Sequence, residues 1–219
     1  MHIRPLGRSF ACLLCALVSF DAGGATAPQG LYERFVQAVA TDRSDDVQAM
    51  LARGMDANTV DPNGDPMLLV AARAGWERTV ELLLAAGAKV DTQNRYGDQP
   101  IMVAALNGHL IIVKKLFTRG ADVNPPGWSP LIYAASNGHV DIMRYLLEVG
   151  AEVDAESPNG TTPLMMAARG GHTEAVALLL ARGADVNRRN QNGATALTWA
   201  RRGGFYEIEK ALQQRGARQ

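Results

Sequence analysis

The stretch Asn159–Asn187, NGTTPLMMAARGGHTEAVALLLARGADVN, predicts two short helices followed by a loop. Thr162 is a suitable N-cap for the first helix, because its hydroxyl can accept a hydrogen bond from a free amide of the first turn. Pro163 then occupies the first helical position, where its missing N–H costs nothing. One apolar stripe at helical spacing is formed by Leu164, Ala167 and Ala168.

A second helix is predicted to begin near Thr173, after the helix-breaking pair Gly170-Gly171. Gly183 ends this helix at the left-handed position that a helix C-terminus often needs. Its apolar stripe consists of Val176, Leu179 and Leu180. Each helix has roughly two to three turns, which is marginal in isolation. The unit therefore needs to bury its apolar face against copies of itself.

Such copies are present along the chain. Glycines heading equivalent blocks are spaced 33, 30, 33 and 33 residues apart, at Gly64, Gly97, Gly127, Gly160 and Gly193. A period of 33 residues containing a turn and two helices is the ankyrin signature. The chain therefore resembles the ankyrin-repeat family over residues 31–219. This resemblance implies an all-α ankyrin-repeat solenoid of about six helix-turn-helix units with β-hairpin-like loops.

The chain divides into a signal peptide, residues 1–27, and an ankyrin-repeat domain, residues 28–219. We expect repeat units at approximately 31–63, 64–96, 97–126, 127–159, 160–192 and 193–219. The closing loop of the third unit is three residues short and contains Pro125-Pro126. We expect this loop to change the surface locally without disturbing the stacking of the helices.

The N-terminal segment resembles a bacterial secretory signal peptide. It has a positively charged start (residues 1–8), an apolar run (10–20) and small residues at 22–27. Cleavage is expected after Ala25 or Ala27, and the mature chain is expected in the periplasm. An uncleaved anchor is the alternative, although the apolar run is short for a membrane span.

Both cysteines, Cys12 and Cys15, lie in this N-terminal segment. Their C-x-x-C spacing has no folded context there, so we reject a redox role. The formal net charge of the chain is zero. There is no basic excess for binding nucleic acid through its phosphates.

The two end units depart from the repeat pattern, as expected of units that close an array at both ends. In the first unit, Ser44 is a candidate N-cap for the second helix. In the last unit, polar residues replace apolar ones at Arg201, Glu209, Gln213 and Gln214. These residues are expected to place water, rather than another repeat, against the end of the array.

The resemblance to ankyrin repeats has one recurring exception. The histidine of the family's Thr-Pro-Leu-His motif is absent, and its positions hold Leu69, Met102, Ile132, Met165 and Thr198. In the family this histidine bonds the helix cap and the next loop. We expect apolar packing to substitute for the hydrogen bonds of this histidine, and we expect adjacent loops to be held together less rigidly.

Candidate metal ligands and catalytic groups recur once per repeat rather than in clusters. His109, His139 and His172 each follow a glycine in an inter-helix turn. Neighbouring repeats are separated by about the 8–10 Å of helix packing, whereas zinc requires all its ligands within about 2.0–2.3 Å. We interpret these histidines as turn residues that form hydrogen bonds.

The loop acids are interpreted in the same way. One or two occur per loop, at Asp56, Asp91, Asp122, Glu152, Asp154 and Asp185, and they are expected to stabilise turns. The segment Asp61–Asp65 is similar to the start of a calcium loop, but Ala72 stands where a bidentate glutamate is needed. We predict no catalytic residues, no metal site and no cofactor.

The surface that remains is the concave side of the array. By resemblance, the family's partner-binding positions fall on Arg73, Arg95, Tyr96, Asp98, Leu106, Asn107, Trp128, Ser136, Asn137 and Arg169. Tyr96 and Trp128 are the candidate anchors, because large exposed aromatic side chains often carry binding energy. Leu106 is expected to form an apolar centre between them. The alternative for Trp128 is local packing over Pro125-Pro126.

These observations predict a non-enzymatic, monomeric scaffold that binds a periplasmic or extracytoplasmic protein through its concave face. No binding of nucleic acid and no membrane insertion of the mature chain are expected. Two alternatives stay open: an inhibitor or immunity protein that blocks a toxin or enzyme, and a small-molecule or metal-dependent enzyme. The sequence does not name the partner.

Overall fold

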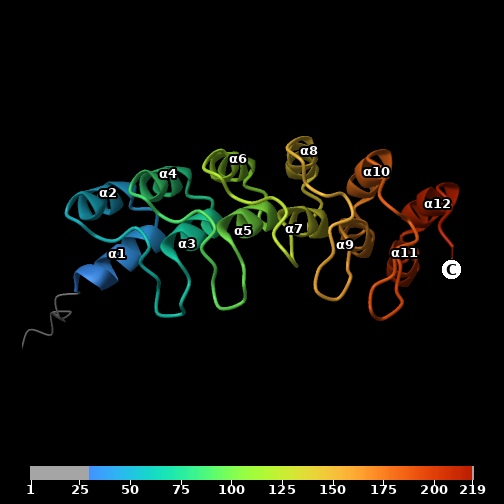
Figure 1. Cartoon of the computed structure of the whole chain (residues 1–219), viewed down its shortest axis with the longest axis horizontal. Helices are drawn as coiled ribbons and strands as arrows, with labels where there is room; N and C mark the ends of the chain where they lie inside the picture. Colours follow the sequence, from blue (N-terminus) through green and yellow to red (C-terminus); the bar gives the residue numbers. More distant parts are fainter. Residues whose placement is uncertain (1–29, 219) are drawn as a thin grey trace, which may run out of the picture.

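The structure is a computed structural model that describes residues 30–218, so the predicted signal peptide and both cysteines lie outside the described residues. Within this range the chain forms twelve α-helices (Figure 1). Their bounds are α1 Leu31–Ala40, α2 Ser44–Ala52, α3 Met67–Ala74, α4 Glu77–Ala85, α5 Pro100–Leu106, α6 Leu110–Thr118, α7 Pro130–Ser136, α8 Val140–Glu148, α9 Pro163–Gly170, α10 Thr173–Ala181, α11 Ala196–Gly203 and α12 Tyr206–Gln214.

The helices stack in two rows. Odd-numbered helices form one row, even-numbered helices form the other, and long loops project beyond the odd-numbered row (Figure 1). Each odd-numbered helix packs against the next one in its row and against the even-numbered helix that follows it in the chain. In the described residues, the only β-type pairing is an isolated bridge between Val60 and Pro66. This arrangement confirms the all-α solenoid with hairpin-like loops.

Helix boundaries follow the predicted capping residues. The backbone amide of Met165 donates to Thr162 Oγ1 at 3.4 Å, and Pro163 is the first residue of α9. Gly171 ends α9 in the left-handed conformation, with φ 73°. The expectation for Ser44 was wrong: Ser44 is the first residue of α2, and Arg43 precedes it without a capping side-chain bond.

The core is continuous from one end of the array to the other. Every unit contributes buried apolar residues to it, from Phe35 in α1 to Leu212 in α12. Within α9 and α10, the predicted stripes of Leu164, Ala167, Ala168, Val176, Leu179 and Leu180 are all buried. Burial of apolar surface contributes roughly 25 cal/mol per Å², so contact between units, rather than the short helices themselves, stabilises the fold.

The inter-helix histidines join neighbouring units, as predicted for turn residues. The Nε2 atom of each lies within hydrogen-bond distance of a carbonyl oxygen near the end of the first helix of the preceding unit. The pairs are His109 with Arg73 O at 3.2 Å, His139 with Leu106 O at 2.9 Å, and His172 with Ser136 O at 2.9 Å. These contacts satisfy carbonyls that the helix ends leave free.

A second set of hydrogen bonds joins adjacent loops. In each loop, a side-chain Oδ1 accepts from a backbone amide of the next loop, at 2.8 to 3.2 Å. The acceptor and donor residues are Asn58 and Lys89, Asp91 and Asp122, Asn124 and Glu152, Asp154 and Asp185, and Asn187 and Arg218. Asparagine and aspartate side chains therefore join each loop to the next, although the family's motif histidine is absent.

At the C-terminal unit the polar substitutions form an ion pair. Arg201 Nε lies 2.7 Å from Glu209 Oε1, and the same oxygen accepts from Gln213 Nε2 at 3.3 Å. The corresponding positions one unit earlier, Ala168 and Val176, are buried between units. The pair thus covers the end of the array with a polar, hydrated surface.

Restoring apolar residues at this end is expected to cause self-association. The double variant Arg201→Ala, Glu209→Val removes the ion pair and exposes an apolar end, which polar capping units normally prevent. Sedimentation velocity should then show a concentration-dependent dimer or larger species, whereas the unaltered chain should keep one concentration-independent sedimentation coefficient. Equal sedimentation of the two proteins at all concentrations would contradict this role of the ion pair.

Candidate partner-binding surface

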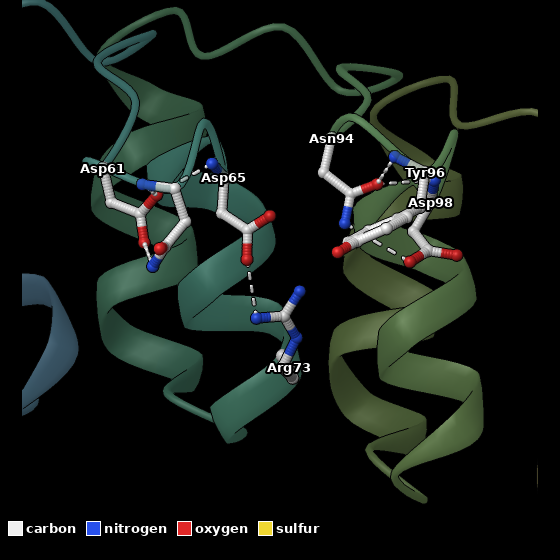
Figure 2. A network of polar contacts seen from close by, with 7 residues as sticks. Asp61, Asp65, Arg73, Asn94, Tyr96 and Asp98 are labelled. Atoms are coloured by element: carbon white, nitrogen blue, oxygen red, sulfur yellow. Dashed lines mark hydrogen bonds and ion pairs between the residues drawn. The ribbon is translucent and has the colours of Figure 1, made fainter.

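The tips of the long loops before α3, α5 and α11 are each closed by one polar side chain. This side chain accepts from the backbone amides two and four residues further along the chain (Figure 2). Asp61 Oδ1 accepts from Asn63 and Asp65, both at 2.8 Å, and Asn94 Oδ1 accepts from Tyr96 and Asp98 at 2.9 and 3.0 Å. These bonds fix the tips before any partner binds, which confirms the turn interpretation of Asp61.

The loop before α7 has no such tip. It is visibly shorter than the loops before α5 and α9 (Figure 1). Pro125 is buried, and Asn124 Nδ2 donates to Gly150 O of the following loop at 2.9 Å. Helix α7 still packs against both α5 and α9. The shortened loop changes the surface locally and leaves the helix stack intact, as predicted.

A hollow of about 460 Å³ lies where the missing tip would be. We call it the tip pocket and define it by its lining residues, Asp91, Gln93, Tyr96, Gly97, Asp98, Gln99, Met102, Asp122, Pro125, Pro126, Gly127, Trp128 and Pro158. It combines apolar walls with carboxylates, and three neighbouring loops contribute to it. The two aromatic residues singled out from the sequence, Tyr96 and Trp128, both line it.

Tyr96 and Trp128 differ in their surroundings. Tyr96 is 72% exposed, and the Arg95 guanidinium lies 4.8 Å from the centroid of its ring. Trp128 is 38% exposed and packs against Tyr133 of α7, with ring centroids 5.8 Å apart. Trp128 thus has a packing partner and also presents part of its ring to the tip pocket.

Asp98 is held in place by two neighbouring units. Tyr133 donates its hydroxyl to Asp98 Oδ1 at 2.5 Å, and Asn94 Nδ2 donates to Asp98 Oδ2 at 3.3 Å. Partial burial of Tyr133, together with the hydrogen bond and the charge of Asp98, raises the pKa of the phenol far above its usual range. Tyr133 therefore stays protonated and keeps the carboxylate oriented at the pocket wall.

The raised pKa predicts a loss of stability at high pH. In the unfolded chain Tyr133 releases its proton near pH 10, while in the folded chain it keeps it. Above that pH the unfolded state binds fewer protons, so the free energy of unfolding falls as pH rises. The Tyr133→Phe variant should lack this part of the decline. Urea unfolding at pH 9, 10 and 11 measures it; parallel profiles for both proteins would contradict the prediction.

Two candidate arginines contact residues of the loops and are thereby engaged within the chain. Arg73, in the last turn of α3, lies 2.8 Å from Asp65 Oδ2 in an ion pair (Figure 2). Arg95 stacks on Tyr96 as described above. Both arginines are exposed and accessible to a partner. Binding a partner would require each of them to break its intramolecular interaction or to keep it while making a second one.

A second group of candidates lies at the C-terminal ends of the odd-numbered helices. Leu106 ends α5, whereas Tyr96 and Trp128 precede the first residues of α5 and α7. Leu106 therefore does not lie between the two aromatic residues, and the expectation of an apolar centre there was wrong. Its carbonyl accepts from Asn137 Nδ2 at 2.8 Å.

The remaining candidates are also placed along these helix ends. Asn107 Nδ2 donates to Val103 O at 2.7 Å, and Ser136 Oγ donates to Tyr133 O at 2.7 Å. The guanidinium of Arg169 lies 5.1 Å from the centroid of a Trp199 ring. The structure thus separates the candidate residues into a group at the loop tips and a group at the helix ends.

Several residues of the tip pocket were not among the sequence-based candidates. These are Asp91, Gln93, Gln99, Met102, Asp122, Pro125, Pro126 and Pro158, besides the glycines. The signal that could have found them is the three-residue deletion in the loop before α7. A missing tip uncovers the preceding loop and Pro158 of the following one, and both contribute lining residues.

Two further observations concern the described part of the chain alone. Residues 30–218 contain no group of three or more His, Cys, Asp or Glu side chains that could hold a metal ion. None of the described helices combines the length and the apolar character needed to cross a membrane.

The repeated helix pairs, the capping glycines and the stacked loops define an ankyrin-repeat protein. A family model described as ankyrin repeats (3 copies) matches residues 35–126 and 131–219, and one described as ankyrin repeats (many copies) matches residues 112–147. The chain belongs to this family. Ankyrin repeats generally mediate protein–protein interaction. No curated protein matches the chain in sequence.

Proposed function

We propose that the protein is a non-enzymatic scaffold that binds another protein through its concave face. The supporting observation is the tip pocket, where two partly exposed aromatic residues are held in place: Tyr96 by the hydrogen bonds of its loop tip, and Trp128 by packing against Tyr133. A surface fixed in this way loses little conformational entropy on binding. The proposed contact residues are the candidates named from the sequence, with Tyr96 and Trp128 as anchors.

The N-terminal segment supports a proposal for where this activity takes place. Its charged start, apolar run and small residues support export through a cleaved signal peptide. We therefore propose that the mature chain works as a monomer in the periplasm, and that its partner is a periplasmic or extracytoplasmic protein.

Affinity capture from periplasmic extract tests the function. The mature protein is compared with the Tyr96→Ala, Trp128→Ala double variant, after circular dichroism has shown that the variant is helical. Tyr206→Ala is the matched control, because Tyr206 is also 72% exposed but lies on α12, in the even-numbered row. We expect one protein to be captured by the unaltered chain and by the control, and to be lost with the double variant. Capture that is equal for all three would contradict the proposed site.

A further inference from the structure

The tip pocket has walls suited to the aliphatic part of a side chain. Trp128, Tyr96 and Met102 line it together with Pro125, Pro126 and Pro158. Prolines and aromatic rings are rigid, so this shape is set before binding. A volume of about 460 Å³ lies within the range of ligand pockets, roughly 300 to 1,000 Å³. The pocket is therefore large enough to enclose a long side chain and part of its backbone.

The charge of the pocket has one sign. Asp91, Asp98 and Asp122 line it, and no lysine, arginine or histidine of the described residues does. Asp91 and Asp122 are exposed, and each uses Oδ1 for a backbone amide. The hydrogen bonds of the described residues leave the Oδ2 atoms of both carboxylates available to a donor. Arg95 is the nearby cation, and it occupies a position over the Tyr96 ring.

A buried acceptor lies among the lining residues. Gln99 is 5% exposed, and among the described residues its Oε1 has no hydrogen-bond partner. Gln99 is the N-cap residue of α5, and its backbone amide donates to Met102 Sδ at 3.4 Å. An unpaired buried acceptor is costly, so a hydrogen-bond donor entering the pocket could relieve this cost after a small rotation of the side chain.

From this charge complementarity we propose that the tip pocket binds the side chain of an arginine or lysine presented by the protein partner. The aliphatic stem would pack between the aromatic and proline walls, and the cationic head would meet Asp91 and Asp122. A cation near an aromatic ring is also attracted by the ring's electrons. This inference rests on the proposed function and specifies which chemistry of the partner the surface recognises.

A variant that lacks two of the aspartate charges isolates the electrostatic contribution to binding. Asp91→Asn, Asp122→Asn removes both charges and keeps an Oδ1 acceptor at each position. Asn58 and Asn124 already accept the loop-to-loop bond that Asp91 accepts, and Asn94 accepts from the amide two residues further along, as Asp122 does, so the fold should be retained. The matched control is Asp154→Asn, Asp185→Asn. It removes two charges from another pair of hydrogen-bonded loops, outside the tip pocket.

The direct test is an NMR titration of the mature, isotope-labelled protein with the peptide acetyl-Gly-Arg-Gly-amide. A second titration uses the same peptide with citrulline, which is similar in shape but uncharged. We expect the arginine peptide to shift the Trp128 indole signal and the Tyr96 amide, with affinity about tenfold lower in the Asp91/Asp122 variant and at high salt. The Asp154/Asp185 control should bind like the unaltered chain.

Equal shifts with citrulline, shifts that map elsewhere, or no shifts at millimolar peptide would overturn the proposal. Capture from periplasmic extract separates this failure from failure of the function. A partner lost with Tyr96→Ala, Trp128→Ala but retained by Asp91→Asn, Asp122→Asn would leave the scaffold function standing and exclude a basic anchor in the pocket.

Discussion

Replacing Gly171 by alanine is expected to destabilise the array far more than replacing Gly204 by alanine. The two glycines occupy the same position at the ends of α9 and α11, with φ 73° and 70°. Alanine at either site meets the left-handed penalty of roughly 1–2 kcal/mol. At Gly171, however, a new Cβ would lie 2.5 Å from the Phe205 ring of the next unit, whereas no atom lies within 4 Å at Gly204.

The additional cost at Gly171 comes from forcing two units apart. Overpacking of this kind costs roughly 1–3 kcal/mol, so Gly171→Ala should lose about 2–5 kcal/mol in total and Gly204→Ala about 1–2 kcal/mol. Urea unfolding followed by circular dichroism measures both. Equal losses would mean that Phe205 moves aside freely and that the turns do not lock neighbouring units together.

Replacing Leu116 by alanine is expected to have a similarly large effect through the core. Leu116 of α6 has 0% exposure, and truncation of a buried leucine costs roughly 2–5 kcal/mol. The control is Ile111→Ala in the same helix, where the side chain is 50% exposed. Changes at such surface positions usually stay within about 0.5 kcal/mol.

The position of Leu116 also makes this variant informative about cooperativity. A repeat array is stabilised by contacts between neighbouring units, so a cavity in a central unit weakens its coupling to both sides. Relative to the unaltered chain, the Leu116→Ala variant should show a larger increase in hydrogen-exchange rate in α5 to α8 than in the terminal helices. If Leu116→Ala and Ile111→Ala gave equal unfolding free energies, the description of a continuous core would be wrong.

Most of the fold could be predicted because each unit repeats the same capping residues and the same apolar pattern. Thr162 and Pro163 start a helix, Gly171 and Gly183 end helices, and the apolar stripe between them must be buried. The loop-to-loop hydrogen bonds could not be predicted in this way. They depend on how far one loop lies from the next, which no single unit specifies.

The lining of the tip pocket was predicted only in part. The family pattern led to Tyr96 and Trp128, which do line one pocket. It misplaced Leu106, because the seven residues of α5 separate Leu106 at the C-terminal end of the helix from the loop tip before its N-terminal end. It also missed Asp91 and Asp122. These residues line the pocket because the loop before α7 is three residues shorter than the others, and the family pattern does not include this shortening.

Photo-crosslinking tests the concave-face account most directly. The photoreactive residue p-benzoylphenylalanine is placed at position 96, on a loop tip, or at position 111, on α6 of the even-numbered row. Both proteins are illuminated in periplasmic extract, and the crosslinked products are identified by mass spectrometry. The account predicts one partner crosslinked from position 96 and not from position 111. The same partner crosslinked from position 111 and not from position 96 would contradict it.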